Sequence, residues 1–306
     1  MKVLIIGASG FIGLPVAQAL VRAGHIVYGV TRSDSKAKSL AAEEIIPIVA
    51  PIEDPSTWLP LVATLDVVIE AISGEVKVLS EMLLTSVTEA AKQYRPPHAP
   101  KLAYIYTSGS WIHGDNRKEI ISDTTPVIQS VDLVSWRPLL EQKVVTNPVL
   151  NGIVIRPALL YGRSASILGM LFKTAYEGKV RWYGTPGGRY ALIHQDDLGE
   201  LYRLAAEKSA VIGGLLFDAA NDFTESVDDI LQKLVEVSGA SGYEYIEPTN
   251  LFEKAITTTL LMRPYLARSL LGWQPRKASL VDYLQIYYNA WKATAGSATL
   301  SSDFIR

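Results

Sequence analysis

A run of glycines between an apolar strand and a helix, close to the N-terminus, constrains this chain more than any other feature. The run reads Gly7-Ala8-Ser9-Gly10-Phe11-Ile12-Gly13 and follows the apolar stretch Lys2–Ile6 directly. Glycines in this setting allow a tight turn, and they let a pyrophosphate approach the backbone N–H groups at the start of a helix. The pattern predicts a dinucleotide-binding turn with the spacing G-x-x-G-x-x-G. The alternative is a turn that serves only the packing of the helix on the strand.

The first half of the chain alternates short β-branched runs with helical stretches, as a parallel sheet with crossover helices requires. The predicted strands are Lys2–Ile6, Ile26–Val30, Ile45–Val49, Val67–Glu70, Leu102–Tyr106 and Gly152–Ile155, and the clearest helices are Phe11–Ala23 and Val76–Tyr94. We therefore expect an α/β fold with a doubly wound parallel Rossmann sheet over residues 1–163. The pattern loosens over residues 164–306, where we expect a smaller, mixed α/β substrate-binding region that is partly interwoven with the sheet domain.

The end of the second strand decides which dinucleotide is expected. An acidic residue there would accept hydrogen bonds from an unmodified ribose 2′-hydroxyl. This chain has Thr31 at that position and Arg32 beside it, and a guanidinium binds a phosphate in a bidentate way. The sequence thus favours NADP(H) over NAD(H), although Arg32 as a merely solvated side chain is the alternative.

Composition excludes several other classes of function. The chain has 306 residues, 29 Lys and Arg against 31 Asp and Glu, and no cysteine. Near-neutral charge argues against nucleic-acid or membrane-surface partners, and the absence of cysteine excludes thiolate metal sites and thiol nucleophiles. Four scattered histidines give no metal-site spacing. No apolar run reaches the roughly 18 residues of a membrane span, so we expect a soluble, cytoplasmic protein.

Four further segments follow the glycine run in a recognisable order: Tyr106–Gly114, Arg156-Pro157-Ala158-Leu159-Leu160-Tyr161-Gly162, Ile193-His194-Gln195-Asp196-Asp197 and Leu271-Gly272-Trp273-Gln274-Pro275. The first is similar to a fifth-strand segment that ends in Val-Tyr-Gly, and the others to Arg-Pro-x-x-x-Tyr-Gly, Val-His-Val-Asp-Asp and Leu-Gly-Trp-x-Pro. Together the segments resemble the extended short-chain dehydrogenase/reductase superfamily, in particular its NAD-dependent epimerase/dehydratase type. The resemblance covers nearly the whole chain and implies a small-molecule substrate bound beside the sheet. It also allows a homodimer.

The chain departs from this family at its catalytic residues. The family uses a Tyr-x-x-x-Lys pair, in which the Lys lowers the pKa of the Tyr and holds the nicotinamide ribose. Alignment on Glu141 places Arg137 at the Lys position and Leu133 at the Tyr position, and alignment on Lys143 places Leu139 at the Tyr position. Neither supplies a phenol. The family's Ser or Thr, which orients the substrate oxygen, falls on Gly109, with Ser108 and Ser110 on either side.

The remaining catalytic candidates are therefore Ser108, Ser110, His113 and Arg137. By resemblance, His113 sits at the mouth of the pocket close to Trp111, where a histidine can act as acid or base near neutral pH. The alternative is a histidine that packs on Trp111. Arg137 can hold the ribose as a permanent cation, or it can form only an exposed helix salt bridge with Glu141.

The other predicted site residues follow from the resemblance. Ala71, Arg137 and Pro157 are assigned to the cofactor, together with the glycine run, Thr31 and Arg32. The substrate is assigned to Trp111, His113, Tyr161, Arg163, Arg189 and Tyr190. In the family an Arg near position 190 often meets a substrate diphosphate, whereas here that position is Tyr190, so a nucleotide sugar is not expected. No metal is expected.

These observations predict an NADP(H)-dependent oxidoreductase that acts on a carbonyl or related group of a small, non-nucleotide metabolite. The missing phenol leaves two alternatives open. One is a non-catalytic dinucleotide-binding sensor or scaffold, and the other is a non-redox isomerase or lyase on the same fold.

Overall fold

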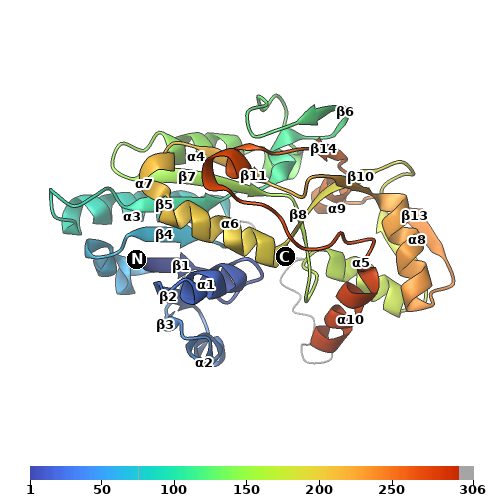
Figure 1. Cartoon of the computed structure of the whole chain (residues 1–306), viewed down its shortest axis with the longest axis horizontal. Coiled ribbons are helices and arrows are strands. Elements are labelled where there is room, and N and C mark those ends of the chain that lie inside the picture. The colour runs from blue at the N-terminus through green and yellow to red at the C-terminus, as the bar shows by residue number, and fades with distance from the viewer. Residues whose placement is uncertain (75, 296–306) are drawn as a thin grey trace.

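A seven-stranded parallel sheet forms the centre of the computed structural model, which describes residues 1–74 and 76–295 (Figure 1). The strand order is β11-β7-β5-β4-β1-β2-β3. The strands are β1 (Lys2–Ile6), β2 (Ile26–Thr31), β3 (Ile46–Val49), β4 (Val67–Glu70), β5 (Ala103–Thr107), β7 (Asn151–Pro157) and β11 (Leu216–Ala219). All six strands predicted from sequence are confirmed. The order reverses between β1 and β4, and at such a point the carboxyl ends of the strands leave a crevice for a ligand.

Helices cover both faces of this sheet because its central strands present apolar side chains on both sides. In β1, Val3 and Ile5 belong to one core cluster and Leu4 and Ile6 to another. The first cluster packs under α1 (Gly13–Arg22) and α6 (Gln195–Glu207). The second packs under α3 (Lys77–Tyr94) and α4 (Arg137–Val145). The helix α2 (Asp34–Ala42) connects β2 to β3, and the predicted doubly wound α/β fold is confirmed.

The C-terminal half contributes two elements to this layered sheet. Strand β11 pairs in parallel with β7 at the edge of the sheet, and α6 packs beside α1 (Figure 1). Both elements come from beyond residue 163, so the chain returns to the sheet after it has left it.

A separate core lies at the other end of the molecule, where α5 (Leu168–Tyr176), α8 (Val227–Ser238) and α10 (Leu284–Ala295) gather (Figure 1). Three small sheets complete this region. The first contains β8 (Leu159–Tyr161), β10 (Arg189–His194) and β12 (Thr224–Ser226). The second pairs β9 (Val180–Tyr183) with β13 (Tyr243–Ile246), and the third pairs β6 (Asn116–Ile121) with β14 (Leu260–Met262). The short helices α7 (Ser209–Ile212) and α9 (Leu251–Ile256) lie between them in sequence. Among the described residues, no helix has the length and apolarity needed to cross a membrane.

Candidate functional site

The glycine turn lies between the carboxyl end of β1 and the first turn of α1. Gly7 has a φ of +86°, and a Cβ added to it would lie 2.5 Å from the carbonyl oxygen of Ala71. An added Cβ at Gly13 would collide with the backbone of Gly7. Packing of the turn therefore accounts for Gly7 and Gly13. Gly10 is exposed at the outer side of the turn, which is the position that a bound pyrophosphate needs.

The end of β2 lies beside this turn. The hydroxyl oxygens of Ser9 and Thr31 are 3.5 Å apart, and Thr31 is buried. Arg32 is exposed, and no hydrogen bond or ion pair to its guanidinium occurs within residues 1–74 and 76–295. Ser33 caps α2 by accepting a hydrogen bond from the N–H of Lys36. This edge thus presents an uncommitted cation where the adenosine ribose of a dinucleotide is expected.

Arg137 begins α4 and reaches the carboxyl end of β5. Its Nη1 donates to the carbonyl oxygen of Thr107 at 3.0 Å and to the hydroxyl of Tyr106 at 3.2 Å. The guanidinium also lies 4.9 Å from the centre of the Trp136 ring. The predicted position of Arg137 near the cofactor edge of the sheet agrees with these contacts.

The alternative interpretation, an exposed salt bridge between Arg137 and Glu141, is wrong. Glu141 is buried, and its carboxylate accepts hydrogen bonds from Arg156, at 2.6 Å from Nη2 and 3.1 Å from Nε. The side chain of Glu141 faces the sheet because Arg156, the first residue of the Arg-Pro motif, points from β7 toward α4.

Ser108 carries a free hydroxyl and directly follows Thr107, whose carbonyl oxygen accepts a hydrogen bond from Arg137. The N–H of Ser108 donates to the carbonyl oxygen of Ile155 at 2.8 Å. Its hydroxyl is buried and has no hydrogen-bond partner among the described residues. A buried polar atom without a partner in a native protein needs an explanation, and a ligand group at this edge would provide one. Ser110 is also buried and begins the short helical turn η3 (Ser110–His113).

The expectation that His113 sits at the mouth of a pocket is wrong. Its side chain is only 1% exposed. Its Nε2 lies 3.0 and 3.1 Å from the two carboxylate oxygens of Asp218, which is on β11. Since Asp218 comes from the seventh strand, which the sequence did not predict, this pairing could not be foreseen. His113 therefore connects η3 to the edge of the sheet.

Two aromatic residues assigned to the substrate belong to the core instead. The hydroxyl of Tyr161 donates to the carbonyl oxygen of Ala278 at 2.8 Å. The hydroxyl of Tyr190 donates to the carbonyl oxygen of Ile256 at 2.7 Å and accepts from the indole of Trp182 at 2.8 Å. Tyr161 is fully buried and Tyr190 nearly so, and their hydroxyls are occupied by protein groups. We correct the assignment of Tyr161 to a packing role. Tyr190 packs in the same core and also borders a small hollow beside Trp111.

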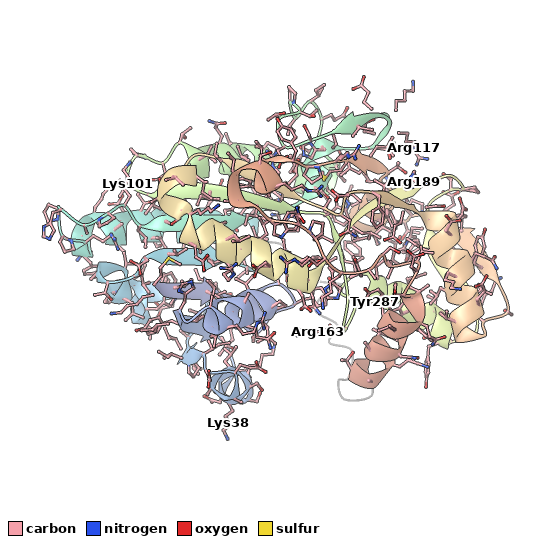
Figure 2. The ribbon with its side chains drawn as sticks, in the orientation of Figure 1. Lys38, Lys101, Arg117, Arg163, Arg189 and Tyr287 are labelled. Carbon is pink, nitrogen blue, oxygen red and sulfur yellow. The ribbon has the colours of Figure 1, made fainter. Side chains whose placement is uncertain are left out.

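The two arginines assigned to the substrate lie apart from each other, as Figure 2 shows. Arg189 is tied to β12, because its Nε donates to the Thr224 hydroxyl at 2.9 Å. Arg163 lies on the loop after β8, and its Nη2 donates to Asp196 at 2.9 Å. The two residues therefore do not form one substrate-binding group.

Two hollows lie beyond η3, in the region where a substrate is expected. The smaller, of about 20 Å³, touches Ser110, Trp111 and Tyr190. The larger, of about 420 Å³, is polar and borders the first one at Thr258. Its lining is Gly114, Asp115, Arg117, Gln129, Ser130, Val131, Asp132, Lys254, Thr257 and Thr258. Sequence reasoning missed these residues because isolated charges far apart in the chain form no motif. Among the described residues, no group of acidic or histidine side chains is arranged to hold a metal ion.

One protein-family model matches the N-terminal part of the chain. Residues 3–129 match the model of the NAD dependent epimerase/dehydratase family. The match covers less than half of the chain. The matched residues include the glycine turn, Arg32, and the segment from Ser108 to His113.

Two curated relatives extend the likeness along the chain. The "Uncharacterized protein C2A9.02" of Schizosaccharomyces pombe is 24% identical over 305 residues, which cover 93% of this chain and 98% of the relative. The sterol-4-alpha-carboxylate 3-dehydrogenase, decarboxylating, of Dictyostelium discoideum is 22% identical over 230 residues, which cover 68% of each protein.

Solved structures share the fold over the full length. A UDP-glucuronic acid 4-epimerase from Bacillus cereus, in complex with UDP-glucuronic acid and NAD, has a TM-score of 0.76 and 22% identity and covers 96% of this chain and 100% of its own. A dTDP-glucose 4,6-dehydratase from Bacillus anthracis, in complex with NAD, has a TM-score of 0.79 and 14% identity and covers 97% of this chain and 98% of its own. Both of these solved structures contain NAD.

Proposed function

We propose that the protein is an NADP(H)-dependent oxidoreductase that reduces a carbonyl or related group of a small, non-nucleotide metabolite. The observation that carries the proposal is the pair formed by Arg137 and Ser108 at the carboxyl end of β5. Arg137 brings a permanent cation to this edge, and Ser108 brings a buried hydroxyl that no protein group satisfies. A bound nicotinamide would supply the hydride.

The residues of this chain would then share the work of the missing Tyr-x-x-x-Lys pair. Arg137 would hold the ribose and stabilise negative charge that develops on the substrate oxygen, because a guanidinium keeps its charge at all physiological pH values. It does not shuttle a proton. The hydroxyl of Ser108, or a water that it orients, would donate a hydrogen bond and then the proton to that oxygen. His113 is disfavoured for this step because its Nε2 is engaged by Asp218.

The environment of Arg189 and Tyr190 supports a substrate that is not a nucleotide sugar. Arg189 donates two hydrogen bonds to Thr224, and the hydroxyl of Tyr190 is saturated. These contacts direct part of the Arg189 guanidinium toward β12 and engage the Tyr190 hydroxyl within the protein, which does not favour a diphosphate at this position. The polar hollow of about 420 Å³ is within the size range of small-molecule sites.

Arg32 supports NADP(H) rather than NAD(H), because it is an exposed cation without a protein partner among the described residues. Titration of protein fluorescence with NADPH and with NADH tests this preference. We expect NADPH to bind about tenfold more tightly, since a charge-assisted contact contributes about 1.5 kcal/mol or more. Arg32→Met should abolish the difference. Arg22→Met is the control, because Arg22 is at the end of α1 away from the glycine turn, and this variant should keep the difference in affinity. Equal affinities in the wild-type protein would contradict the preference.

A second candidate is a dinucleotide-binding sensor without redox activity. It is favoured by Leu133, which stands where the family has its catalytic Tyr. Oxidation of NADPH with a panel of small aldehydes and ketones distinguishes the two functions. Turnover with any of them would exclude the sensor, and loss of that turnover in Ser108→Ala would support the proposed role of the hydroxyl.

A further inference from the structure

We propose that Gln195 and Arg163, two residues of the C-terminal half, position the pyrophosphate-binding turn of the N-terminal half. They are positioning residues, since they act on the turn and not on the ligand itself. The inference rests on the proposed dinucleotide binding and adds a requirement for it that the glycine motif does not contain.

Two successive hydrogen bonds connect Arg163 through Gln195 to the glycine turn. Gln195 is the first residue of α6 and is 3% exposed. In the amide orientation that satisfies both of its polar atoms, its nitrogen donates to the carbonyl oxygen of Phe11 at 3.2 Å. Its oxygen then accepts from Nε of Arg163, also at 3.2 Å.

Arg163 is held by protein acceptors on three sides. In addition to Gln195, its Nη2 donates to Asp196 at 2.9 Å and its Nη1 to Gln18 on α1 at 3.4 Å. Asp196 also lies 3.0 Å from Nζ of Lys277. Asp196 is thus fixed by two cations, and it in turn fixes the guanidinium of Arg163 beside the turn.

The geometry of the peptide bond explains how the contact of Gln195 with Phe11 affects phosphate binding. The bond between Phe11 and Ile12 is planar and trans, so its carbonyl and its N–H point in opposite directions. Gln195 fixes the direction of the Phe11 carbonyl, and thereby that of the Ile12 N–H. Ile12 is the N-cap of α1, and N–H groups at this end of a helix bind phosphate.

Gln195 departs from the family pattern that its segment resembles. The family stretch that the segment resembles reads Val-His-Val-Asp-Asp, whereas this chain reads Ile193-His194-Gln195-Asp196-Asp197. A valine in place of Gln195 has no group that could bond to the Phe11 carbonyl. The polar side chain is buried here, so it needs these two partners.

The loop that carries Arg163 is built to hold it in this position. Arg163, Ala165 and Ser166 all have positive φ values, of 41°, 67° and 50°. Gly162 precedes them, and an added Cβ there would collide with the imidazole of His194. Non-glycine residues adopt such a conformation only where their surroundings impose it. The close packing of the loop on His194 and the contacts of Arg163 together impose it.

The test compares two ligands in three variants. The ligands are NADPH, which contains the pyrophosphate, and 2′-AMP, which lacks it. The variants are Gln195→Met, Arg163→Met and, as a matched control, Arg181→Met, whose side chain pairs with Glu244 on β13. We expect the first two to weaken NADPH binding about five- to tenfold, as the loss of a hydrogen bond implies. Their affinity for 2′-AMP should stay within about twofold of the wild-type value, which is less than one hydrogen bond contributes.

A merely structural role gives a different result, because general loosening would weaken both ligands equally. Unchanged NADPH affinity, or an equal loss for both ligands, overturns the inference. If Gln195→Met does not fold, Gln195→Glu retains the acceptor for Arg163 and removes the donor to Phe11, and it must show the same selective loss. Absence of dinucleotide binding in the wild-type protein would instead refute the proposed function, and the inference with it.

Discussion

At the residue scale, the departures from the family occur where the local backbone can accommodate another side chain. Gly109 is the clearest case. By resemblance it takes the position of the family's hydroxyl residue. It has an extended φ of −177°, and an added Cβ would meet only the carbonyl oxygen of Pro157, at 4.0 Å. Neither backbone conformation nor space requires glycine there. The buried hydroxyl without a partner belongs to the neighbouring residue, Ser108.

Gly109→Ser is therefore expected to fold with a free energy of unfolding within about 0.5 kcal/mol of the wild-type value, as for an unstrained substitution. Gly114→Ser is the matched control. Gly114 has a φ of +70°, and an added Cβ would collide with the carbonyl oxygen of Gln129, so a loss of about 2 kcal/mol is expected from strain and overlap. Urea unfolding measures both. Similar losses in the two variants would show that Gly109 is required for packing.

The acid stability of the protein should depend on His194. Burial, the largest cause, lowers the pKa of His194 from an ordinary value of 6.5 to about 4, together with the cations of Lys277 and Arg163 and against the opposing effect of Asp196. In the folded state its Nδ1 accepts from the N–H of Asp196. Between pH 6.5 and 4 the unfolded chain binds a proton that the folded chain does not, so stability falls as the pH falls through this window.

The variant His194→Asn isolates this contribution, because asparagine also caps a helix but does not titrate. We expect the free energy of unfolding of the wild-type protein to fall more steeply between pH 6.5 and 4.5 than that of the variant. Thermal unfolding as a function of pH supplies the measurement. Parallel curves for the two proteins would mean that His194 does not contribute to the acid sensitivity.

At the element scale, the strands that could be predicted are those whose apolar runs are continuous. β1, β4 and β5 lie between two layers of helices, so both of their faces are apolar. Strand β11 reads Leu216–Ala219 and contains Asp218, and β6 is polar and mostly exposed. Such strands depend on partners that are remote in sequence and carry no local signal.

The site residues likewise could be predicted only where their roles depend on residues near them in sequence. The glycine turn and the position of Arg137 follow from spacing, because they depend on one strand and the helix that follows it. The roles of His113, Tyr161 and Tyr190 do not, since each depends on a partner more than sixty residues away, or on the direction of a side chain. A motif gives the place of a residue along the chain, and the packing of other elements decides what its side chain contacts.

The attachment of α4 to the sheet depends on the buried pair between Glu141 and Arg156. Loss of the Glu141 charge leaves Arg156 with a longer contact, to Asp218 at 3.9 Å, in place of a direct buried ion pair, and breaking such a pair costs about 3 kcal/mol or more. We expect Glu141→Gln to lower the free energy of unfolding by about that amount. Glu81→Gln removes the exposed partner of Lys143, 3.3 Å away, and should cost less than about 1 kcal/mol. Urea unfolding of the two variants measures the difference, and equal effects would refute the role of the buried pair.

At the scale of the whole molecule, the sheet is complete only when both halves of the chain contribute to it. Strand β11 covers the edge of β7, and α6 buries Leu198, Leu201 and Tyr202 against the face that also carries α1. Asp218 pairs with His113 and lies 3.9 Å from Arg156. The glycine turn itself is in contact with Gln195. The cofactor-binding half is therefore supported by elements that follow residue 163.

A fragment of residues 1–163 is expected not to reach a cooperative native state. It lacks α6, which covers one face of the sheet, and β11, which covers the edge of β7. It also lacks Asp218, the partner of His113. A longer fragment, residues 1–222, retains α6 and β11 and should show near-ultraviolet circular dichroism and a urea transition that the shorter fragment lacks. The comparison separates the two elements from the more distant helices α8 and α10, which both fragments lack. Cooperative unfolding of the 1–163 fragment would show that the first half forms its sheet alone, and that α6 and β11 stabilise a structure that already exists. If only the longer fragment unfolds cooperatively, the folding unit is the sheet with both of its layers, and the dinucleotide-binding turn depends on residues that lie far beyond its own motif.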